Sequence, residues 1–200
     1  MRIGVFGGTF DPIHIGHLVA ATNAKYAAGL DLCYFVVANV PWQKENARVV
    51  TPADVRLGLV ERAIAGLPGF AVSDLEIRRG GYSYTYDTLL ELGESHPDDE
   101  LYLIVGADAA LEMTSWERAS ELSQLAELVI VSRPGFVAPT EILGWSSWVM
   151  VEIPSLAISS TDLRQRAIDG RPLDFLLPRF AIDYIKETNL YRDGGVNESS

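Results

Sequence analysis

The chain of 200 residues contains a single cysteine, Cys33. One cysteine cannot form an internal disulfide, and it excludes metal sites built from several cysteines. Cys33 lies in an apolar run, so we expect a buried structural thiol rather than a nucleophile. The sequence also lacks an apolar run of the ~20 residues that a membrane-spanning helix requires, and its first residues do not read as a signal peptide. We therefore predict a cytoplasmic protein with no membrane partner.

Basic residues are scarce as well, with 16 Lys and Arg against 27 Asp and Glu, and the net charge is −11. A nucleic-acid-binding surface needs a basic face, so a nucleic-acid partner is not expected. A small anionic ligand remains compatible with this charge, provided that main-chain N–H groups and a few placed cations hold it.

Short apolar runs alternate with helical patterns along the chain, which predicts an α/β protein with a doubly wound parallel sheet. We expect strands at 3–6, 32–38, 70–75, 101–105, 128–131 and 148–153. The main helices are expected at 18–28, 52–65, 85–93, 116–125, 159–168 and 178–186. Residues 1–192 would form one Rossmann-like domain with a C-terminal helical extension at about 159–192. The Gly, Asn and Ser-rich residues 193–200 are expected to be a disordered tail.

Polar clusters follow five of the expected strands, at 7–17, 41–44, 106–108, 133 and 159–164. In a doubly wound sheet, ligands bind beyond the carboxyl ends of the strands. These clusters should therefore converge on one edge of the sheet, and this convergence predicts a binding site there.

The stretch from Gly7 to His17 (GGTFDPIHIGH) connects the first strand to the first helix. The two glycines allow close approach of the backbone, and the helix start favours an anion. His14 and His17 share one face of the first turn and could donate hydrogen bonds to phosphate. The alternatives are cap or surface histidines, while a metal site is disfavoured because no third ligand lies nearby. Asp11 could simply brace the loop.

Three hydroxyl residues, Ser159, Ser160 and Thr161, open a helix near the C-terminus. Ordinary N-capping accounts for one of them. The other two hydroxyls, together with Arg164 one turn later, favour a phosphate site over capping alone.

Other candidate binding residues are expected at the same edge of the sheet, and each of them also has a purely structural interpretation. Lys44 lies in a polar loop and alone is a weak signal, whereas Arg133 directly follows a strand. Trp116 could stack on a planar ring or belong to the core. The helix start at Thr85 could hold a carboxylate, and Asp108 is suited to a ribose hydroxyl.

Two motifs carry a resemblance to a known superfamily. The stretch Gly7–His17 matches the GxFDPxHxGH element of the nucleotidylyltransferases, and residues 158–164 (ISSTDLR) match their second element. The segments 85–89, 106–108, 115–116 and 132–135 resemble the bacterial nicotinate-nucleotide adenylyltransferases, with details similar to actinobacterial members. The resemblance covers about residues 1–192.

That resemblance implies transfer of the adenylyl group of ATP to nicotinate mononucleotide with Mg²⁺, giving nicotinate adenine dinucleotide and pyrophosphate. The transfer would be a direct in-line attack without a covalent intermediate. Catalytic roles would fall to His14, His17, Lys44 and Arg164. ATP would contact Gly7, Gly8, Thr9, Phe10, His14, His17, Gly106, Asp108, Ser159, Ser160, Thr161 and Arg164. The mononucleotide would contact Thr9, Lys44, Thr85, Trp116 and Arg133.

Three rival interpretations stay open at this stage. Phosphopantetheine adenylyltransferases share both end motifs, although they are shorter. The amide substrate, nicotinamide mononucleotide, could be preferred over the acid. A catalytically inactive nucleotide-binding module is a third alternative, against which the intact His14, His17 and Arg164 argue. The oligomeric state is also left open, a homo-oligomer included.

Overall fold

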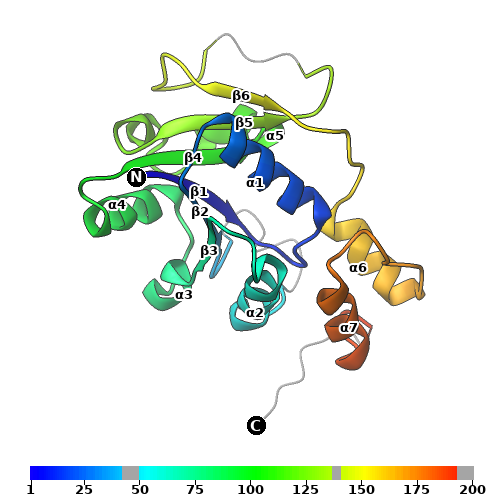
Figure 1. Ribbon diagram of the computed structural model, residues 1–200. Helices are drawn as coiled ribbons and strands as arrows, with labels where there is room; N and C mark the ends of the chain where they lie inside the picture. Colours follow the sequence, from blue (N-terminus) through cyan, green and yellow to red (C-terminus); the bar gives the residue numbers. More distant parts are fainter. Residues whose placement is uncertain (42–49, 137–140, 193–200) are drawn as a thin grey trace.

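A computed structural model describes residues 1–41, 50–136 and 141–192 of the chain. These residues form a six-stranded sheet in the order β3-β2-β1-β4-β5-β6, in which all neighbouring strands are parallel (Figure 1). The strands are β1 (Arg2–Gly8), β2 (Leu32–Val37), β3 (Phe70–Ser73), β4 (Glu100–Gly106), β5 (Glu127–Ser132) and β6 (Val149–Glu152). The strand order reverses between β1 and β4, which is where a doubly wound sheet opens a crevice for ligands.

The centre of the sheet is dry and tightly packed at β1. Ile3 and Val5 are 0% and 2% exposed. A Cβ added at Gly4 would lie 2.7 Å from a side-chain carbon of Leu30 and 2.9 Å from one of Ile104. Glycine at this position therefore lets side chains from neighbouring segments close over the strand.

Helices cover both faces of the sheet, and two hydrophobic clusters result. Buried residues of α1 (Ile15–Ala27) and α2 (Ala53–Ile64) form one cluster with the sheet. Those of α4 (Thr85–Ser95) and α5 (Ala107–Glu112) form the other. Shorter elements are α3 (Leu75–Arg79) and the 3₁₀ turns Met113–Ser115 and Ala119–Gln124.

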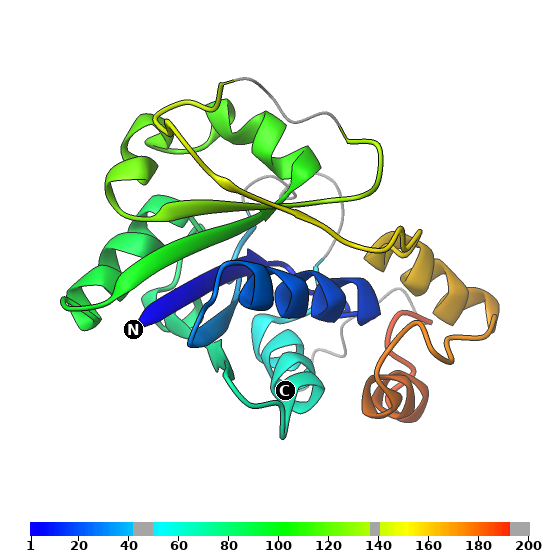
Figure 2. The ribbon, with the colours of Figure 1, turned by 45° about the horizontal axis from the view of Figure 1, so that its top comes forward.

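The C-terminal helices α6 (Ser160–Asp169) and α7 (Arg179–Glu187) stand together beside the sheet (Figure 2). Their buried residues, among them Leu163 and Ile182, belong to the same cluster as Phe6 of β1. This packing brings the start of α6 to the end of β1. No helix among the described residues combines the length and the apolar character needed to cross a membrane.

The α/β class, the doubly wound sheet and the order of the main elements are confirmed. Some details are wrong. The first helix begins at Ile15 rather than Leu18, because the motif residues themselves form its first turn. Within α1, Ala21 and Ala24 are fully buried, whereas Tyr26 is 89% exposed.

Other boundaries also differ from the prediction. The third strand ends at Ser73, and the residues after it form the short helix α3 instead of continuing into a loop. The expected helix 116–125 is a 3₁₀ turn at Ala119–Gln124. Cys33 is buried as expected, and its burial raises the pKa of the thiol to about 12.

Candidate active site

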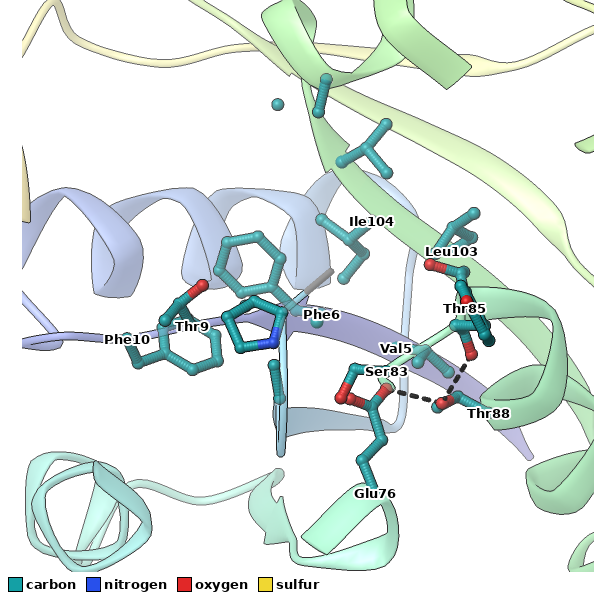
Figure 3. Close-up of a pocket in the computed structure, with 18 of the residues that line it drawn as sticks. Val5, Phe6, Thr9, Phe10, Glu76, Ser83, Thr85, Thr88, Leu103 and Ile104 are labelled. Atoms are coloured by element: carbon teal, nitrogen blue, oxygen red, sulfur yellow. Dashed lines mark hydrogen bonds between the residues drawn. The ribbon is translucent and has the colours of Figure 1, made fainter. Parts of the chain in front are cut away.

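Two adjoining cavities open at the carboxyl ends of the central strands. The first has a volume of about 330 Å³ and the second about 720 Å³. Both are lined by the glycine turn, by His17, by Gly106 at the end of β4 and by Ser160 at the start of α6. Figure 3 shows the first cavity with side chains from β1, β4 and the start of α4 around it. The clusters at 7–17, 106–108, 133 and 159–164 therefore converge at this edge as predicted, whereas residues 42–44 of the fifth cluster lie outside the described residues.

The phenyl ring of Phe10 packs tightly against the glycine turn. A Cβ at Gly8 would lie 2.7 Å from the ring of Phe10, whereas a Cβ at Gly7 would meet no atom within 4 Å. Phe10 is 2% exposed and has a positive φ of 47°. A left-handed backbone is costly for a bulky residue and persists only where the surroundings enforce it. The ring of Phe10 lies edge-on to His17, with centroids 5.1 Å apart.

The two imidazoles of the motif lie face to face, with ring centroids 3.6 Å apart and planes inclined by 22°. The backbone N–H of His14 donates to Nδ1 of His17 over 3.2 Å. Because Nδ1 of His17 accepts this bond, the neutral ring carries its proton on Nε2. The backbone of the motif thus fixes His17 as an Nε2–H donor at the edge shared by both cavities.

His14 is the more deeply buried of the pair, at 6% exposure. Burial lowers the pKa of its imidazole to about 4, because the cation would lose its hydration. Its Nδ1 has no hydrogen-bond partner in the part of the chain that the structure describes. At neutral pH His14 is therefore an uncharged ring that supports His17 and lines the second cavity.

The burial of His14 predicts a pH-dependent stability. An unfolded imidazole takes up its proton near pH 6.5, the folded one only near pH 4, so the unfolded chain binds more protons between these values. The contribution of His14 to the free energy of unfolding is therefore fully present above pH 6.5. It is lost as the pH falls from 6.5 toward 4, which lowers the free energy of unfolding by at most about 3 kcal/mol. His14→Asn should lack this component when free energies of unfolding by urea are compared across that range. Parallel curves for the two proteins would contradict the assignment.

The loop after β1 is braced from two distant segments by Asp11, which is 1% exposed. Its carboxylate accepts from the backbone N–H of Thr51 at 3.3 Å and from the hydroxyl of Tyr191 at 2.8 Å. Nη1 of Arg164 donates to the backbone carbonyl of Asp11 at 2.7 Å. The interpretation of Asp11 as a brace is confirmed, and Arg164 is placed against the same loop.

All three hydroxyls at the start of α6 have partners within the protein. Ser159 accepts from the backbone N–H of Asp162 at 3.2 Å and caps the helix. Ser160 donates to the carbonyl of Pro12 at 3.0 Å, and Thr161 accepts from Nη2 of Arg164 at 3.1 Å. Ser160 therefore fastens α6 to the loop after β1, whereas Thr161 holds the side chain of Arg164 on the same helix. All three residues, with Arg164, still line the second cavity.

The second cavity receives further polar groups from the ends of two strands. Asp108 lies in the first turn of α5 after β4, and Arg133 follows β5 directly. Both side chains are exposed. Arg133 was assigned to the mononucleotide, but the structure places it on the cavity of the residues predicted to contact ATP. Its role stays a prediction.

The first cavity holds Thr9, Thr85 and Trp116, three of the residues predicted to contact the mononucleotide. Nε1 of Trp116 is buried and has no hydrogen-bond partner among the described residues. A buried donor of this kind calls for a partner that a ligand or water supplies. Lys44 lies outside the described residues, so its predicted role stays a prediction.

Two buried charged residues beside the first cavity were missed. Arg56, on α2, is 1% exposed, and Glu76, on α3, is 6% exposed. Arg56 falls on the buried stripe of α2, which continues through Leu59, Val60 and Ile64. An arginine at helical spacing with apolar residues was the available signal. Glu76 gave no such signal, since its segment was expected to be a strand end and a loop.

A metal site made by the protein alone is not found among residues 1–41, 50–136 and 141–192. No group of three or more His, Cys, Asp or Glu side chains there is arranged to hold an ion. The polar groups of the second cavity are mainly hydrogen-bond donors and cations, which suit phosphate oxygens.

Comparison with known proteins identifies a matching family model and similar proteins that share one name. Residues 5–166 match the family model described as cytidylyltransferase-like. A protein of Corynebacterium kroppenstedtii named "probable nicotinate-nucleotide adenylyltransferase" is 46% identical over 196 residues, covering 97% of this chain and 92% of its own. A protein of the same name from Mycobacterium tuberculosis is 47% identical over 196 residues, with coverage of 94% and 91%.

Solved structures show the same fold. The nicotinic acid mononucleotide adenylyltransferase of Plasmodium falciparum, complexed with NaAD, superimposes with a TM-score of 0.78 at 24% identity. The superposition covers 95% of this chain and 97% of that one. At this identity the likeness establishes the architecture, which agrees with the sheet described above.

Proposed function

Because the chain belongs to the cytidylyltransferase-like family and, within it, to the nicotinate-nucleotide adenylyltransferases, we propose that it transfers the adenylyl group of ATP to nicotinate mononucleotide. The products are nicotinate adenine dinucleotide and pyrophosphate. The observation that carries the proposal is the pair of cavities that adjoin at the glycine turn and His17. Two substrates bound in them would meet at that histidine.

The contents of the cavities support one substrate for each. The second, larger cavity combines the start of α6 and Arg164 with His14 and Asp108, a set suited to a nucleoside triphosphate. The first cavity has an aromatic side chain, Trp116, and the start of α4 at Thr85, which suit a pyridine ring with a carboxylate.

The proposed reaction is a direct in-line transfer. A phosphate oxygen of the mononucleotide attacks the α-phosphorus of ATP and forms the new P–O bond. The bond from the α-phosphorus to the bridging oxygen of the β-phosphate breaks, and pyrophosphate leaves with the electron pair. The attacking phosphate is already an anion, so no general base is required, and positioning with charge stabilisation accounts for catalysis.

His17 would stabilise the charge that develops during the transfer. Its Nε2–H, fixed by the bond from the backbone of His14 to Nδ1, would donate to an oxygen on the α-phosphorus. His14 would contribute as a neutral ring, because its lowered pKa of about 4 keeps it uncharged at working pH. Arg164 would supply the cation at the triphosphate, and Lys44 a second one.

We propose that Mg²⁺ enters bound to the phosphates of ATP. Mg²⁺ commonly combines substrate phosphates, water and few protein carboxylates, and the donors of the second cavity fit the phosphates rather than the ion itself. When bound, the ion neutralises charge on the triphosphate and on the leaving pyrophosphate.

Pyrophosphate release from Mg·ATP should be fast with nicotinate mononucleotide and slow with nicotinamide mononucleotide or phosphopantetheine. The acid carries a carboxylate that the α4 start favours through its N–H groups and helix dipole, and the bulky thiol arm of phosphopantetheine lacks the pyridine ring. The measurement is a coupled pyrophosphate assay of kcat/KM with the three acceptors at matched concentrations, with product identity checked by mass.

Omission of any acceptor provides the control, because an in-line transfer without a covalent intermediate releases no pyrophosphate from ATP alone. Equal or faster turnover with the amide would change the proposed substrate. Turnover only with phosphopantetheine, or none with any acceptor, would contradict the proposed function.

A further inference from the structure

Arg56 is an unusual charge to find inside this molecule. Its side chain is 1% exposed and is the largest of those that are fully buried. A buried cation is costly unless hydrogen bonds and opposite charge compensate it. The groups that compensate the buried charge of Arg56 therefore indicate which segments of the chain this residue holds in place.

The guanidinium donates to three backbone carbonyls from three separate segments. Nη1 reaches Thr9 in the turn after β1 at 2.7 Å. Nη2 reaches Asn39 after β2 at 3.1 Å, and Nε reaches Thr51 before α2 at 2.7 Å. The planar guanidinium fork can bind several acceptors at fixed angles, which an ammonium group cannot do.

The connection continues from Asn39 to the other wall of the first cavity. The backbone N–H of Asn39 donates to the hydroxyl of Ser83 at 2.8 Å, and its side-chain amide donates to the carbonyl of Gly81 at 3.0 Å. Ser83 in turn donates its backbone N–H to Val40 at 3.0 Å. Arg56 is thus linked through Asn39 to the loop that leads into Thr85 and α4.

A second buried titratable residue, Glu76, lines the first cavity. Figure 3 shows its carboxylate directed at Ser83 and Thr88, and the hydroxyl of Thr88 donates to it at 2.6 Å. Burial raises the pKa of the Glu76 carboxyl, whereas the hydrogen bonds of Ser83 and Thr88, and to a smaller extent the charges of Arg79 and Arg56, act in the opposite direction. Glu76 therefore supports the same wall of the first cavity to which Arg56 is linked through Asn39.

We propose that Arg56 is a positioning residue for the transfer reaction, which fixes the backbone at Thr9 and at Asn39 and so sets the width of the first cavity. This inference rests on the proposed function, because the cavity is assigned there to the mononucleotide. Arg56 does not line either cavity, so its effect on a substrate would pass through Thr9 and Ser83. The second cavity, where ATP is placed, contains neither of these residues.

Arg56→Lys keeps the charge but replaces the planar fork by one nitrogen with three rotatable donors, so it tests the geometry of the fork itself. We expect kcat to fall ~10-fold or more and the KM for nicotinate mononucleotide to rise, because small misplacements at a reacting centre are costly. The KM for ATP should change less than the KM for the mononucleotide, because Thr9 and Ser83 line only the first cavity, although both cavities share the glycine turn. Arg62→Lys is the matched control, because Arg62 lies on the same helix and is exposed.

Two further measurements separate positioning from general damage. In the absence of substrates, amide hydrogen exchange of Arg56→Lys should rise at residues 7–10 and 39–40 but not at 159–164. Guanidinium chloride at low millimolar concentration should restore activity to Arg56→Ala, and equal sodium chloride should not.

The proposal would be overturned if Arg56→Lys had wild-type kinetics and exchange, or if both KM values and the exchange pattern stayed unchanged while kcat fell. An unfolded Arg56→Lys would also overturn it, by making Arg56 a requirement for folding only. If the wild-type protein and Arg62→Lys release no pyrophosphate with the mononucleotide, the proposed function fails instead, and the exchange result still decides whether Arg56 fixes the loops.

Discussion

His17→Ala is expected to lower kcat by ~10²–10³, the effect of losing one strong donor to a developing oxyanion. The expectation follows from the geometry of the motif, in which the backbone N–H of His14 donates to Nδ1 of His17 and leaves the proton on Nε2. The KM for ATP should change little, because the donor acts mainly on charge that develops during the transfer. Steady-state kinetics with both substrates varied measures the effect.

His96→Ala is the matched control for a histidine removed elsewhere. His96 lies beyond α4 and pairs with Asp99 at 3.2 Å, close to the N-terminus and away from both cavities. Its variant should keep wild-type kcat. His17→Asn should retain part of the rate if its amide reaches the same oxygen. A near-normal kcat in His17→Ala would remove His17 from the mechanism.

The order of elements could be predicted because each strand is a continuous apolar run and each helix ends at a local signal. Such signals lie within a few residues of each other in the sequence. The helix α3 could not be predicted in this way, since its five residues carry charge at most positions and lack a period. Its position is decided by Leu75 and Glu76, which are buried against distant segments.

The two motifs identified both histidines, the glycine turn and the hydroxyls of α6 that line the cavities, because each motif is contiguous and contains these residues itself. The assignment of hydroxyls to phosphate was less secure. Ser160 donates to the carbonyl of Pro12, a partner set by the packing of α6 against the loop after β1, whereas Thr161 accepts from Arg164 on its own helix. Sequence spacing within α6 contains no information about the packing against the loop.

The charge state of His14 also depends on the fold. Its lowered pKa arises from burial, and burial depends on segments that meet only in three dimensions. The neighbouring Ile15, for example, donates its backbone N–H to the carbonyl of Leu176 in the loop before α7. Arg56 and Glu76 were missed for the same reason. Buried charges acquire their partners from other elements, so a single sequence gives at most a position on an apolar stripe.

Arg164→Ala is expected to lower kcat/KM for ATP by ~10²-fold, mainly through a higher KM. The guanidinium donates to the carbonyl of Asp11 at 2.7 Å and to the hydroxyl of Thr161 at 3.1 Å. Arg164 also lines the second cavity. Hydrogen bonds to a charged group are worth about 1.5–3 kcal/mol each, and 1.36 kcal/mol corresponds to about a tenfold change in rate.

Arg164→Lys separates charge from geometry at this position. A lysine keeps the positive charge for the triphosphate but cannot span Asp11 and Thr161 together, so the loop after β1 would lose its tie to α6. We expect an intermediate KM for ATP together with a lower kcat, because the misplaced loop carries His14 and His17. Arg166→Ala is the control on the same helix, where the side chain pairs with Asp162 at 2.6 Å and lines neither cavity.

The comparison among the three variants decides what Arg164 does. If it only binds the triphosphate, Arg164→Lys keeps wild-type kcat and shows a modest increase in KM for ATP. If it also positions the motif, kcat falls in Arg164→Lys even at saturating ATP, and amide exchange rises at residues 11–17. Equal kinetics in Arg164→Ala and Arg166→Ala would exclude both roles, since the two arginines differ in their access to the second cavity and not in their helix.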